Sequence, residues 1–370
     1  MMKKKYYSLK PILEKNALYN VIFSGRSNGK TYAVIRYALE KYFKTGEQLA
    51  ILRRWEEDFV GAASARTMYE SLINNGNGEN DIKELSGGEY DGVEYYAGRY
   101  FLTVYDEEKG RSLRTDKVIA YAFALTQHEH YKSGSFPNIT TIFFDEFITK
   151  GIYLQDEFIK FQSICSTIIR QRGNVTIFMC GNTVNQYNPY FGEMGLYNAA
   201  FMKKGSIDIY TYGESGLTCA VEYAEMPPKK KVESSKYFAF KNSKLRMITE
   251  GDWELDIYPH CPCKILPKDI LFTYFVIFNN NILQCEICMC DRKLFTFVHL
   301  KSGDIKYPES DLVYSFEPSP LPNRSTNFLR PKNAIEKKIL QLYLNDKYFY
   351  QSNEVGEMFT NFINNCKSKV

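Results

Sequence analysis

One turn, at residues 24–31, constrains the fold of this chain more than any other segment. It follows a short apolar run at residues 20–24 and precedes residues 31–44, whose apolar side chains recur at helical spacing. A Gly-rich turn that ends in Gly-Lys-Thr between a strand and a helix is typical of a phosphate-binding loop. The usual first glycine of such a loop is Ser24 here, and Gly25 stands one place later. This departure leaves an ordinary strand–turn–helix connection as the alternative.

Phosphate binding would use this turn in a specific way. Small residues let backbone N–H groups approach phosphate oxygens, and the N-terminus of the next helix adds its positive dipole end. We expect Lys30 to bridge the β- and γ-phosphates of ATP, and the Thr31 hydroxyl to bind Mg²⁺. The predicted nucleotide-binding residues of this segment are Ser24, Gly25, Arg26, Ser27, Asn28, Gly29, Lys30 and Thr31.

A second apolar strand, at residues 139–144, ends in two adjacent acids, Asp145 and Glu146. Carboxylates at the end of a buried strand are costly unless they are paired or bind a cation. We therefore predict that Asp145 holds Mg²⁺ through water, and that Glu146 is the catalytic residue that orients or deprotonates the attacking water. Two surface acids at the start of a turn are the alternative, which the six apolar or β-branched residues before them disfavour.

Other polar residues stand at the ends of predicted elements. Asn182 follows the predicted strand 174–180, where it either contacts the γ-phosphate or is a plain turn residue. Arg170 and Arg172 follow a predicted helix. A cation supplied by a neighbouring subunit can accelerate phosphoryl transfer by about 10³–10⁵. A solvated helix end is the alternative for these arginines.

The adjacent arginines Arg53 and Arg54 raise the same choice between catalysis and structure, because they end a predicted strand at residues 48–52.

Short apolar strands that alternate with helices predict an α/β fold of the P-loop NTPase type, with a mostly parallel central sheet flanked by helices. The predicted elements are strands at 20–24, 48–52, 139–144 and 174–180, helices at 31–44 and 156–170, and inserted hairpins between about 93 and 125. We expect this ATPase domain to cover residues 1–205.

The character of the chain changes after residue 205. Pro227-Pro228 and the lysines that follow indicate a linker, which we place at residues 206–228. Residues 271–300 alternate around an Asn-Asn-Asn turn and predict a hairpin, and residues 333–347 predict an amphipathic helix. We therefore expect a small, strand-rich α+β domain at residues 229–370.

Composition excludes few functions. The 370 residues include 47 basic and 43 acidic side chains, and a net charge of +4 is too mild to indicate nucleic-acid binding by itself. No run of about 18 apolar residues predicts a membrane span, and the Met-Met-Lys-Lys-Lys start does not lead into an apolar signal segment. The nine cysteines then indicate thiols in a reducing cytoplasm.

The second domain contains two patterns that resemble metal or nuclease chemistry. Cys285-x-x-Cys288 has ligand-like spacing, but no second such pair exists, and we expect thiols rather than a zinc site. A nuclease needs acids that converge on two metal ions. The acids of this domain follow no such pattern, and no nuclease activity is expected.

Beyond the phosphate loop, the chain resembles the genome-packaging ATPases, or DNA encapsidation proteins, of small short-tailed bacteriophages. The resemblance spans most of the predicted ATPase domain and is faint in the second domain. The matching segments are Val21–Tyr32, Gly46–Gln48, Arg53-Arg54, Lys132-Ser133, Phe136–Asn138, Thr141–Ile148, Thr167–Arg172, Gly181-Asn182 and Asn188–Phe191. The later segments discriminate best, because generic ATPases have no reason to share them.

The resemblance implies a homo-oligomeric ring, commonly a pentamer, that docks on the portal of a procapsid in the host cytoplasm and drives double-stranded DNA inward with ATP. It implies the additional-strand, catalytic-glutamate class of P-loop fold and a degenerate RNase H-type second domain. Arg170 is similar to the family's arginine finger, and Lys132 to a second cation that acts in trans. In some members a structural RNA joins the motor to the portal.

Two other functions remain open from the sequence. One is a different DNA-pumping or helicase-type ring of the same ATPase class. The other is a nucleotide-gated scaffold that binds ATP without turnover, which the catalytic assignment of Glu146 opposes.

Overall fold

The computed structural model describes most of the chain in two compact units, Met1–Thr149 with Asp156–Glu254, and Lys150–Gln155 with Leu255–Val370. The residues described are 7–26, 28–61, 64–74, 78–149, 153–183, 188–225, 258–261, 263–278, 281–290, 292–317 and 319–368. Among these residues, no helix is long and apolar enough to cross a membrane.

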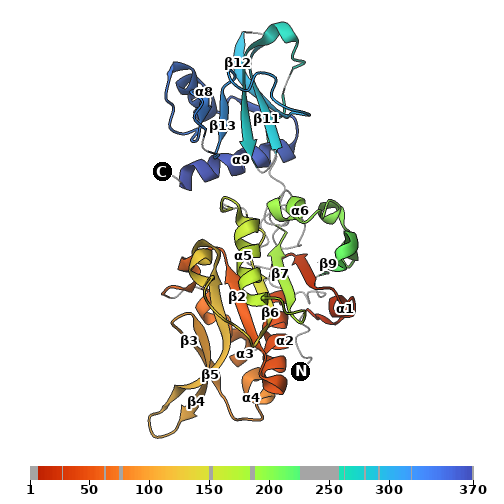
Figure 1. The fold of residues 1–370 in the computed structure, drawn as a ribbon, viewed down its shortest axis with the longest axis vertical. Helices are drawn as coiled ribbons and strands as arrows, with labels where there is room; N and C mark the ends of the chain where they lie inside the picture. The colour runs from red at the N-terminus through yellow and green to blue at the C-terminus, as the bar shows by residue number, and fades with distance from the viewer. Residues whose placement is uncertain are drawn as a thin grey trace, which may run out of the picture. The chain divides into compact units, whose positions relative to one another are not determined.

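A nine-stranded sheet forms the centre of the first unit (Figure 1). Its order is β3-β4-β5-β2-β6-β7-β1-β9-β8. Neighbours in the stretch β5-β2-β6-β7-β1-β9 are parallel, and the pairs β3–β4, β4–β5 and β8–β9 are antiparallel. The strands are β1 Tyr19–Ser24, β2 Gln48–Arg53, β3 Gly92–Tyr96, β4 Arg99–Asp106, β5 Arg111–Ala124, β6 Ile139–Asp145, β7 Thr176–Asn182, β8 Ile207–Tyr212 and β9 Leu217–Tyr223. The four predicted core strands and the antiparallel insertion are confirmed.

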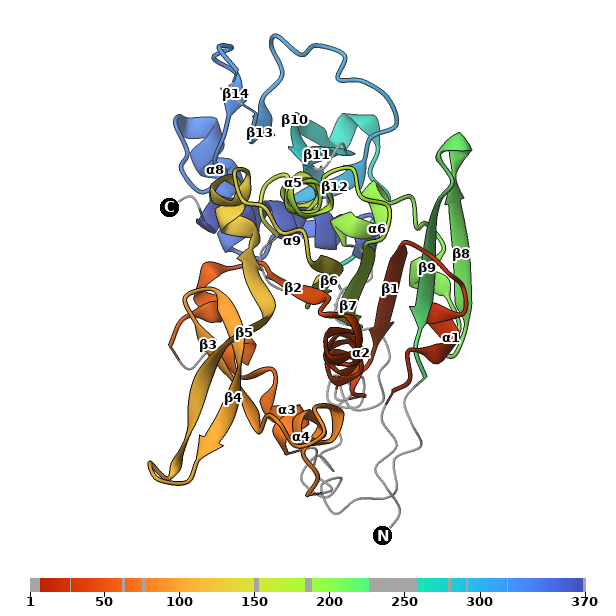
Figure 2. The same cartoon turned by 60° about the horizontal axis from the view of Figure 1, so that its bottom comes forward.

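The helices of the first unit cover both faces of this sheet (Figure 2). They are α1 Lys10–Leu13, α2 Lys30–Thr45, α3 Glu70–Ile73, α4 Asp81–Leu85, α5 Glu157–Ile169 and α6 Pro189–Glu193, and a 3₁₀ segment, η3, spans Leu125–Tyr131. The predicted helices at 31–44 and 156–170 are thus confirmed as α2 and α5.

Neighbouring residues of β6 show why a continuous apolar run suits this strand. Successive side chains of a strand point to opposite faces of the sheet. Phe143 belongs to the core that α2 covers with Val34, Ile35 and other apolar residues. Phe144 stacks on Phe161 of α5, with 5.4 Å between the ring centroids. A strand that is buried on both faces therefore has a continuous run of apolar residues instead of alternating apolar and polar ones.

The predicted linker at 206–228 requires a correction. Residues 207–223 form the hairpin β8–β9, and β9 pairs in parallel with β1, from Tyr19 opposite Cys219 to Phe23 opposite Tyr223. The hairpin belongs to the sheet because the second half of β9, Cys219–Tyr223, is buried beside β1. The Pro227–Lys231 segment, on which the linker prediction was based, lies outside the described residues.

A six-stranded sheet forms the second unit, in the order β14-β13-β10-β11-β12-β15. The strands are β10 Ile270–Phe278, β11 Asn281–Cys290, β12 Lys293–Leu300, β13 Val313–Ser315, β14 Arg324–Ser325 and β15 Tyr348–Tyr350, with helices α8 Ala334–Leu344 and α9 Asn353–Ser368. The predicted hairpin and C-terminal helix are confirmed as β10–β11 and α8; Asn279 and Asn280 of the turn lie outside the described residues.

The pairing in this second sheet has a recognisable order. Strands β10, β11 and β12 are antiparallel neighbours, while β13 pairs in parallel with β10 and β14 in parallel with β13. Counted along the chain, these five strands lie in the order 3-2-1-4-5, as in an RNase H-type sheet. Side chains of α8 and α9, including Ile339, Phe359 and Phe362, complete its core.

Candidate nucleotide-binding site

The turn between β1 and α2 has the geometry of a phosphate loop. β1 ends at Ser24 and α2 begins at Lys30. Gly29 precedes the helix with φ 91°, a left-handed conformation that glycine adopts without strain. The Asn28 side chain accepts a hydrogen bond from the Lys30 N–H at 3.1 Å, which closes the turn. Ser27 lies outside the described residues, and Arg26 is exposed.

Lys30 folds back over the loop rather than extending into solvent. Its side chain is buried, and its Nζ donates to Ser24 Oγ at 2.7 Å, to the Gly25 carbonyl at 3.3 Å and to Asn182 Oδ1 at 3.4 Å. Burial lowers the pKa of Lys30 to about 8, and the nearby thiol of Cys180 and carboxylate of Asp145 oppose that shift. The ammonium group is therefore held at the tips of β1 and β7.

The two acids predicted to serve the metal and the water stand at the tip of β6. Thr31 donates its hydroxyl to Asp145 Oδ1 at 3.2 Å, so the first turn of α2 meets the acid strand directly. Arg53, at the end of neighbouring β2, donates to Asp145 Oδ2 at 2.8 Å and to Glu146 Oε2 at 2.7 Å. Burial raises the pKa of Asp145, against the lowering effect of the Arg53 guanidinium.

Glu146 differs from Asp145 in both exposure and backbone. Its side chain is 61% exposed, whereas that of Asp145 is 7% exposed. Its φ is 58°, in the left-handed region that residues with a Cβ rarely occupy. Such strain is characteristic of functional positions. The turn after β6 thus separates a buried acid from an exposed one.

The arrangement fits a bound Mg²⁺ by the chemistry of its donors. Mg²⁺ prefers oxygen ligands, usually keeps several waters, and takes one or two protein ligands together with substrate phosphates. The Thr31 hydroxyl and the Asp145 carboxylate provide two such oxygens at the mouth of the phosphate loop. Among the described residues, no cluster of three or more His, Cys, Asp or Glu side chains could hold a metal.

The parallel strands explain why these residues meet. Ser24, Arg53, Asp145 and Asn182 end β1, β2, β6 and β7, and parallel strands bring their carboxyl ends to one edge of the sheet. The sequence placed Lys30, Thr31, Asp145 and Asn182 at this site, and the structure brings them together.

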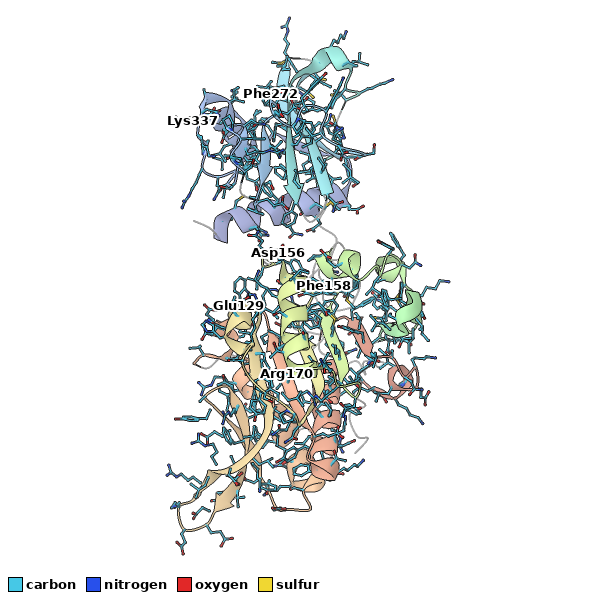
Figure 3. The ribbon with its side chains drawn as sticks, in the orientation of Figure 1. Glu129, Asp156, Phe158, Arg170, Phe272 and Lys337 are labelled. Carbon is cyan, nitrogen blue, oxygen red and sulfur yellow. The ribbon has the colours of Figure 1, made fainter. Side chains whose placement is uncertain are left out.

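Two predicted catalytic residues lie elsewhere. Arg170 caps the C-terminus of α5, and α5 runs from the carboxyl ends of the strands toward their starts. Figure 3 shows Asp156 and Arg170 at opposite ends of this helix. Arg170 donates to the backbone carbonyl of Lys132 at 3.2 Å, and both residues line an open cavity of about 830 Å³ beside α5. The structure therefore groups Arg170 with Lys132 beside α5, and Arg170 stands at the end of this helix that lies away from the phosphate loop.

The neighbouring Arg172 has a different environment. Its guanidinium donates to the carbonyls of Pro137 at 2.6 Å and Phe136 at 3.1 Å, and its Nε to that of Ile169 at 3.2 Å. These bonds tie the end of α5 to the segment that leads into β6. Arg172 thus has a structural role at the start of β6, whereas the Arg170 guanidinium donates to the Lys132 carbonyl.

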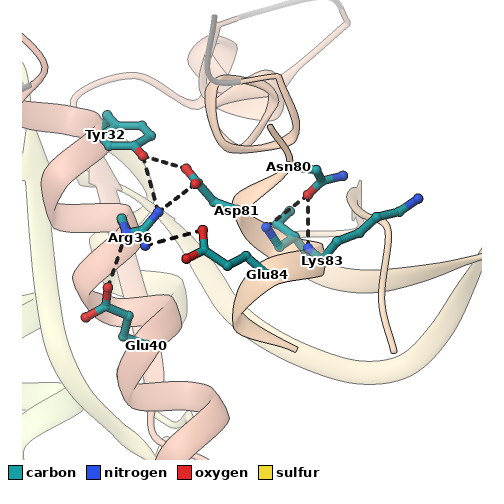
Figure 4. A network of polar contacts seen from close by, with 8 residues as sticks. Tyr32, Arg36, Glu40, Asn80, Asp81, Lys83 and Glu84 are labelled. Carbon is teal, nitrogen blue, oxygen red and sulfur yellow. Dashed lines mark hydrogen bonds and ion pairs between the residues drawn. The ribbon is translucent and has the colours of Figure 1, made fainter. Parts of the chain in front are cut away.

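A polar network beside the phosphate loop could not be read from the sequence. Tyr32, the residue after Thr31, donates to the buried Asp81 at 2.5 Å, and Arg36, one turn later, donates to the same carboxylate at 2.6 Å (Figure 4). The helical spacing of Tyr32 and Arg36 was the only available signal. The network anchors the first turns of α2 to α4.

Together, the fold and the site define a P-loop NTPase. Strand β7 lies between β1, which enters the phosphate loop, and β6, which ends in the two acids; this is the additional strand that the resemblance implied. The chain belongs to the Podovirus DNA encapsidation protein (Gp16) family, whose model matches residues 1–83 and 98–208.

Individual relatives are distant. The DNA packaging protein of Bacillus phage phi29 is 28% identical over 195 residues, which are 52% of this chain and 50% of that protein. The DNA packaging protein of Bacillus phage B103 is 28% identical over 189 residues, 50% of each chain. The chain spans about half the length of the curated relatives it matches.

Two solved structures share the fold over nearly the whole chain. A structure described as the Phi-28 gp11 DNA packaging motor has a TM-score of 0.59 at 18% identity and covers 98% of both chains. The bacteriophage Phi-29 viral genome packaging motor assembly has a TM-score of 0.56 at 18% identity and covers 97% of this chain and 100% of that chain.

Proposed function

We propose that this protein is an ATP-driven translocase that packages double-stranded viral DNA into a procapsid and hydrolyses ATP at the subunit interfaces of a homo-oligomeric ring. Family membership supports DNA packaging, and relatives that match half of the chain are named DNA packaging proteins. The observation that carries the ATPase assignment is the meeting of Lys30, Thr31, Asp145 and Glu146 at one edge of the sheet.

Each of these residues has a chemical task in hydrolysis. The loop amides and the Lys30 ammonium neutralise phosphate charge. Thr31 with Asp145 would hold Mg²⁺, which would supply further positive charge to the phosphates. A carboxylate oxygen of Glu146 orients the attacking water and accepts its proton. The exposure of Glu146 suits this task, because water must reach it, while the burial of Asp145 suits a fixed ligand.

The position of Arg170 and Lys132 supports catalysis across a subunit interface. Arg170 lies at the C-terminal end of α5, the helix end that points away from the phosphate-loop edge of the sheet, and its guanidinium contacts the Lys132 carbonyl. A neighbouring ring subunit can bring them to its partner's γ-phosphate, where such cations act as arginine fingers. Arg170 suits this role better than Arg172, because the Arg172 guanidinium donates to the carbonyls of Ile169, Pro137 and Phe136, whereas that of Arg170 donates to the Lys132 carbonyl.

The remaining assignments follow from the family resemblance. The ring is a pentamer that docks on the procapsid portal in the host cytoplasm, with or without a structural RNA between them. We also propose that the second unit has no nuclease activity: strands β10 and β13, which pair in parallel, contain no aspartate or glutamate.

Replacement of Glu146 by glutamine tests the ATPase assignment. We expect turnover of ATP to fall by about 10²–10⁴, the usual contribution of a general base, while ATP binding is retained. Steady-state phosphate release and equilibrium binding of a fluorescent ATP analogue measure the two quantities. Replacement of the exposed Glu107, on the β4–β5 hairpin, by glutamine is the control.

The same assay separates the rival functions. Turnover stimulated by procapsids together with DNA supports packaging, whereas full stimulation by DNA alone supports another DNA-pumping ring. A wild-type protein that binds ATP but shows no turnover under either condition would be a nucleotide-gated scaffold.

A further inference from the structure

Arg54, the residue after Arg53, is buried directly behind the catalytic turn. Its Nε and one terminal nitrogen each donate to a different oxygen of Glu157 at 2.8 Å. The same guanidinium donates to the backbone carbonyl of Phe147 at 2.9 Å and to that of Glu146 at 3.3 Å. Arg54 therefore contacts the main chain of the residue predicted to activate water.

The backbone at Glu146 needs such contacts. A residue with a Cβ at φ 58° is strained and persists only where its surroundings over-determine it. Three bonds restrain this turn: the two from Arg54, and one from the Phe147 N–H to the Cys180 carbonyl on β7 at 3.2 Å. The mostly exposed Glu146 side chain is thus aimed by its main chain and by the Arg53 guanidinium, which donates to its Oε2 at 2.7 Å.

Glu157 is built to hold Arg54 in place. It is the first residue of α5, is 3% exposed, and accepts a hydrogen bond from the Tyr190 hydroxyl at 2.6 Å in addition to the two from Arg54. The positive end of the helix dipole also favours a carboxylate in this first turn. The Arg54 guanidinium lies 6.0 Å from the centre of the Phe144 ring, on the strand that ends in Asp145.

The free-energy cost of burying the Arg54–Glu157 ion pair favours a functional role for this pair. Burial of two charges is expensive, and a buried ion pair is often no more stabilising than apolar residues of the same volume. A bidentate guanidinium does, however, fix direction as well as distance, because its planar donors match one carboxylate and leave further N–H groups aimed at the carbonyls.

We propose that Arg54 is a positioning residue for ATP hydrolysis: with Glu157, it holds the Glu146 backbone in the left-handed conformation that directs the carboxylate at the attacking water. This inference rests on the proposed ATPase function, since it concerns how the same site is kept in order.

Arg54→Lys tests the proposal, because lysine keeps the charge but has three donors on one nitrogen and cannot make the four bonds that Arg54 makes. We expect kcat to fall by about 10- to 100-fold, as for a small misplacement of a catalytic group, with the affinity for a fluorescent ATP analogue unchanged within about twofold. Arg114→Lys, at an ion pair with Glu94 on the β3–β5 hairpins, is the matched control. An unchanged kcat in Arg54→Lys would overturn the proposal.

A double-mutant cycle with Glu146→Gln separates positioning from a general structural role. If Arg54 acts through the Glu146 carboxylate, Arg54→Lys lowers kcat in the wild-type background but adds no further loss in Glu146→Gln. An equal loss in both backgrounds would contradict the proposal. Should Arg54→Lys fail to fold, Tyr190→Phe, which removes only the hydroxyl on Glu157, replaces it in the cycle with a smaller expected loss of about threefold to tenfold.

ATP turnover by the wild-type protein distinguishes a failure of the proposed ATPase function from a failure of the positioning role. If the wild-type protein shows no ATP turnover, the ATPase assignment itself fails. If the wild type turns over ATP and both Arg54→Lys and Tyr190→Phe match it in kcat, only the positioning role is wrong.

Discussion

Lys30 shows how a single residue can be prepared for its ligand by the fold around it. Burial lowers its pKa to about 8, so in the free protein it changes charge within an accessible pH range. A phosphate group would favour the ammonium form and raise this pKa again. The charge of Lys30 is therefore linked to nucleotide binding.

This linkage predicts that ATP binds more weakly as pH rises through about 8. At pH 9 about one tenth of Lys30 is protonated before binding, so we expect about tenfold lower affinity than at pH 7 and uptake of close to one proton on binding. Calorimetry of Mg²⁺·ATP binding to Glu146→Gln, in buffers of different ionisation enthalpy, measures both. Equal affinity at pH 7.5 and 9 without proton uptake would count against the prediction.

At the scale of elements, α2 is fixed by more than its apolar face. Asp81 of α4 is fully buried and accepts hydrogen bonds from Tyr32 and Arg36 on α2. Since these residues are in the first two turns after the phosphate loop, the contact sets where the loop's helix begins.

Asp81→Ala should therefore lower the free energy of unfolding by about 2–3 kcal/mol, because hydrogen bonds to a charged group are lost and buried donors remain. Glu84→Ala is a matched control: Glu84 lies 3.8 Å from the same Arg36, but its side chain is 64% exposed. Its loss should be below about 0.5 kcal/mol. Urea unfolding of the full chain measures both variants, and equal effects would show that burial at Asp81 is unimportant.

At the scale of the whole molecule, α5 separates the two halves of the predicted catalytic machinery. Its first residue, Glu157, is tied through Arg54 to the turn that carries Glu146, and its C-cap is Arg170. A subunit thus offers its acid at one edge of the sheet and its arginine at the other. This polarity suits a ring with head-to-tail interfaces, where each site is completed by a neighbour.

Mixed rings test that arrangement. Arg170→Ala and Glu146→Gln should each be nearly inactive alone, but an equal mixture should recover up to about a quarter of wild-type turnover, the share of interfaces that pair an intact acid with an intact arginine. Phosphate release from mixed rings is the measurement. Complementation by Arg172→Ala instead of Arg170→Ala would reverse the choice between the two arginines.

The sequence by itself determined the local parts of this protein. The strand–turn–helix at the phosphate loop, the acid pair after β6 and the lengths of α2 and α5 depend on residues close together in the chain, and their apolar spacing is enough to predict them. It also gave Lys30, Thr31, Asp145 and Asn182 as members of one site, since carboxyl ends of parallel strands meet.

Only the tertiary structure decided which distant residues become neighbours. Arg53 meets Glu146 across 93 positions and Arg54 meets Glu157 across 103, and no periodic pattern specifies such partners. The place of β9 beside β1, which corrected the predicted linker, and the distance of Arg170 from its own phosphate loop follow from strand order in the same way. Strand order depends on how all the strands of the sheet are buried together. The residue pattern of any single segment does not specify that order.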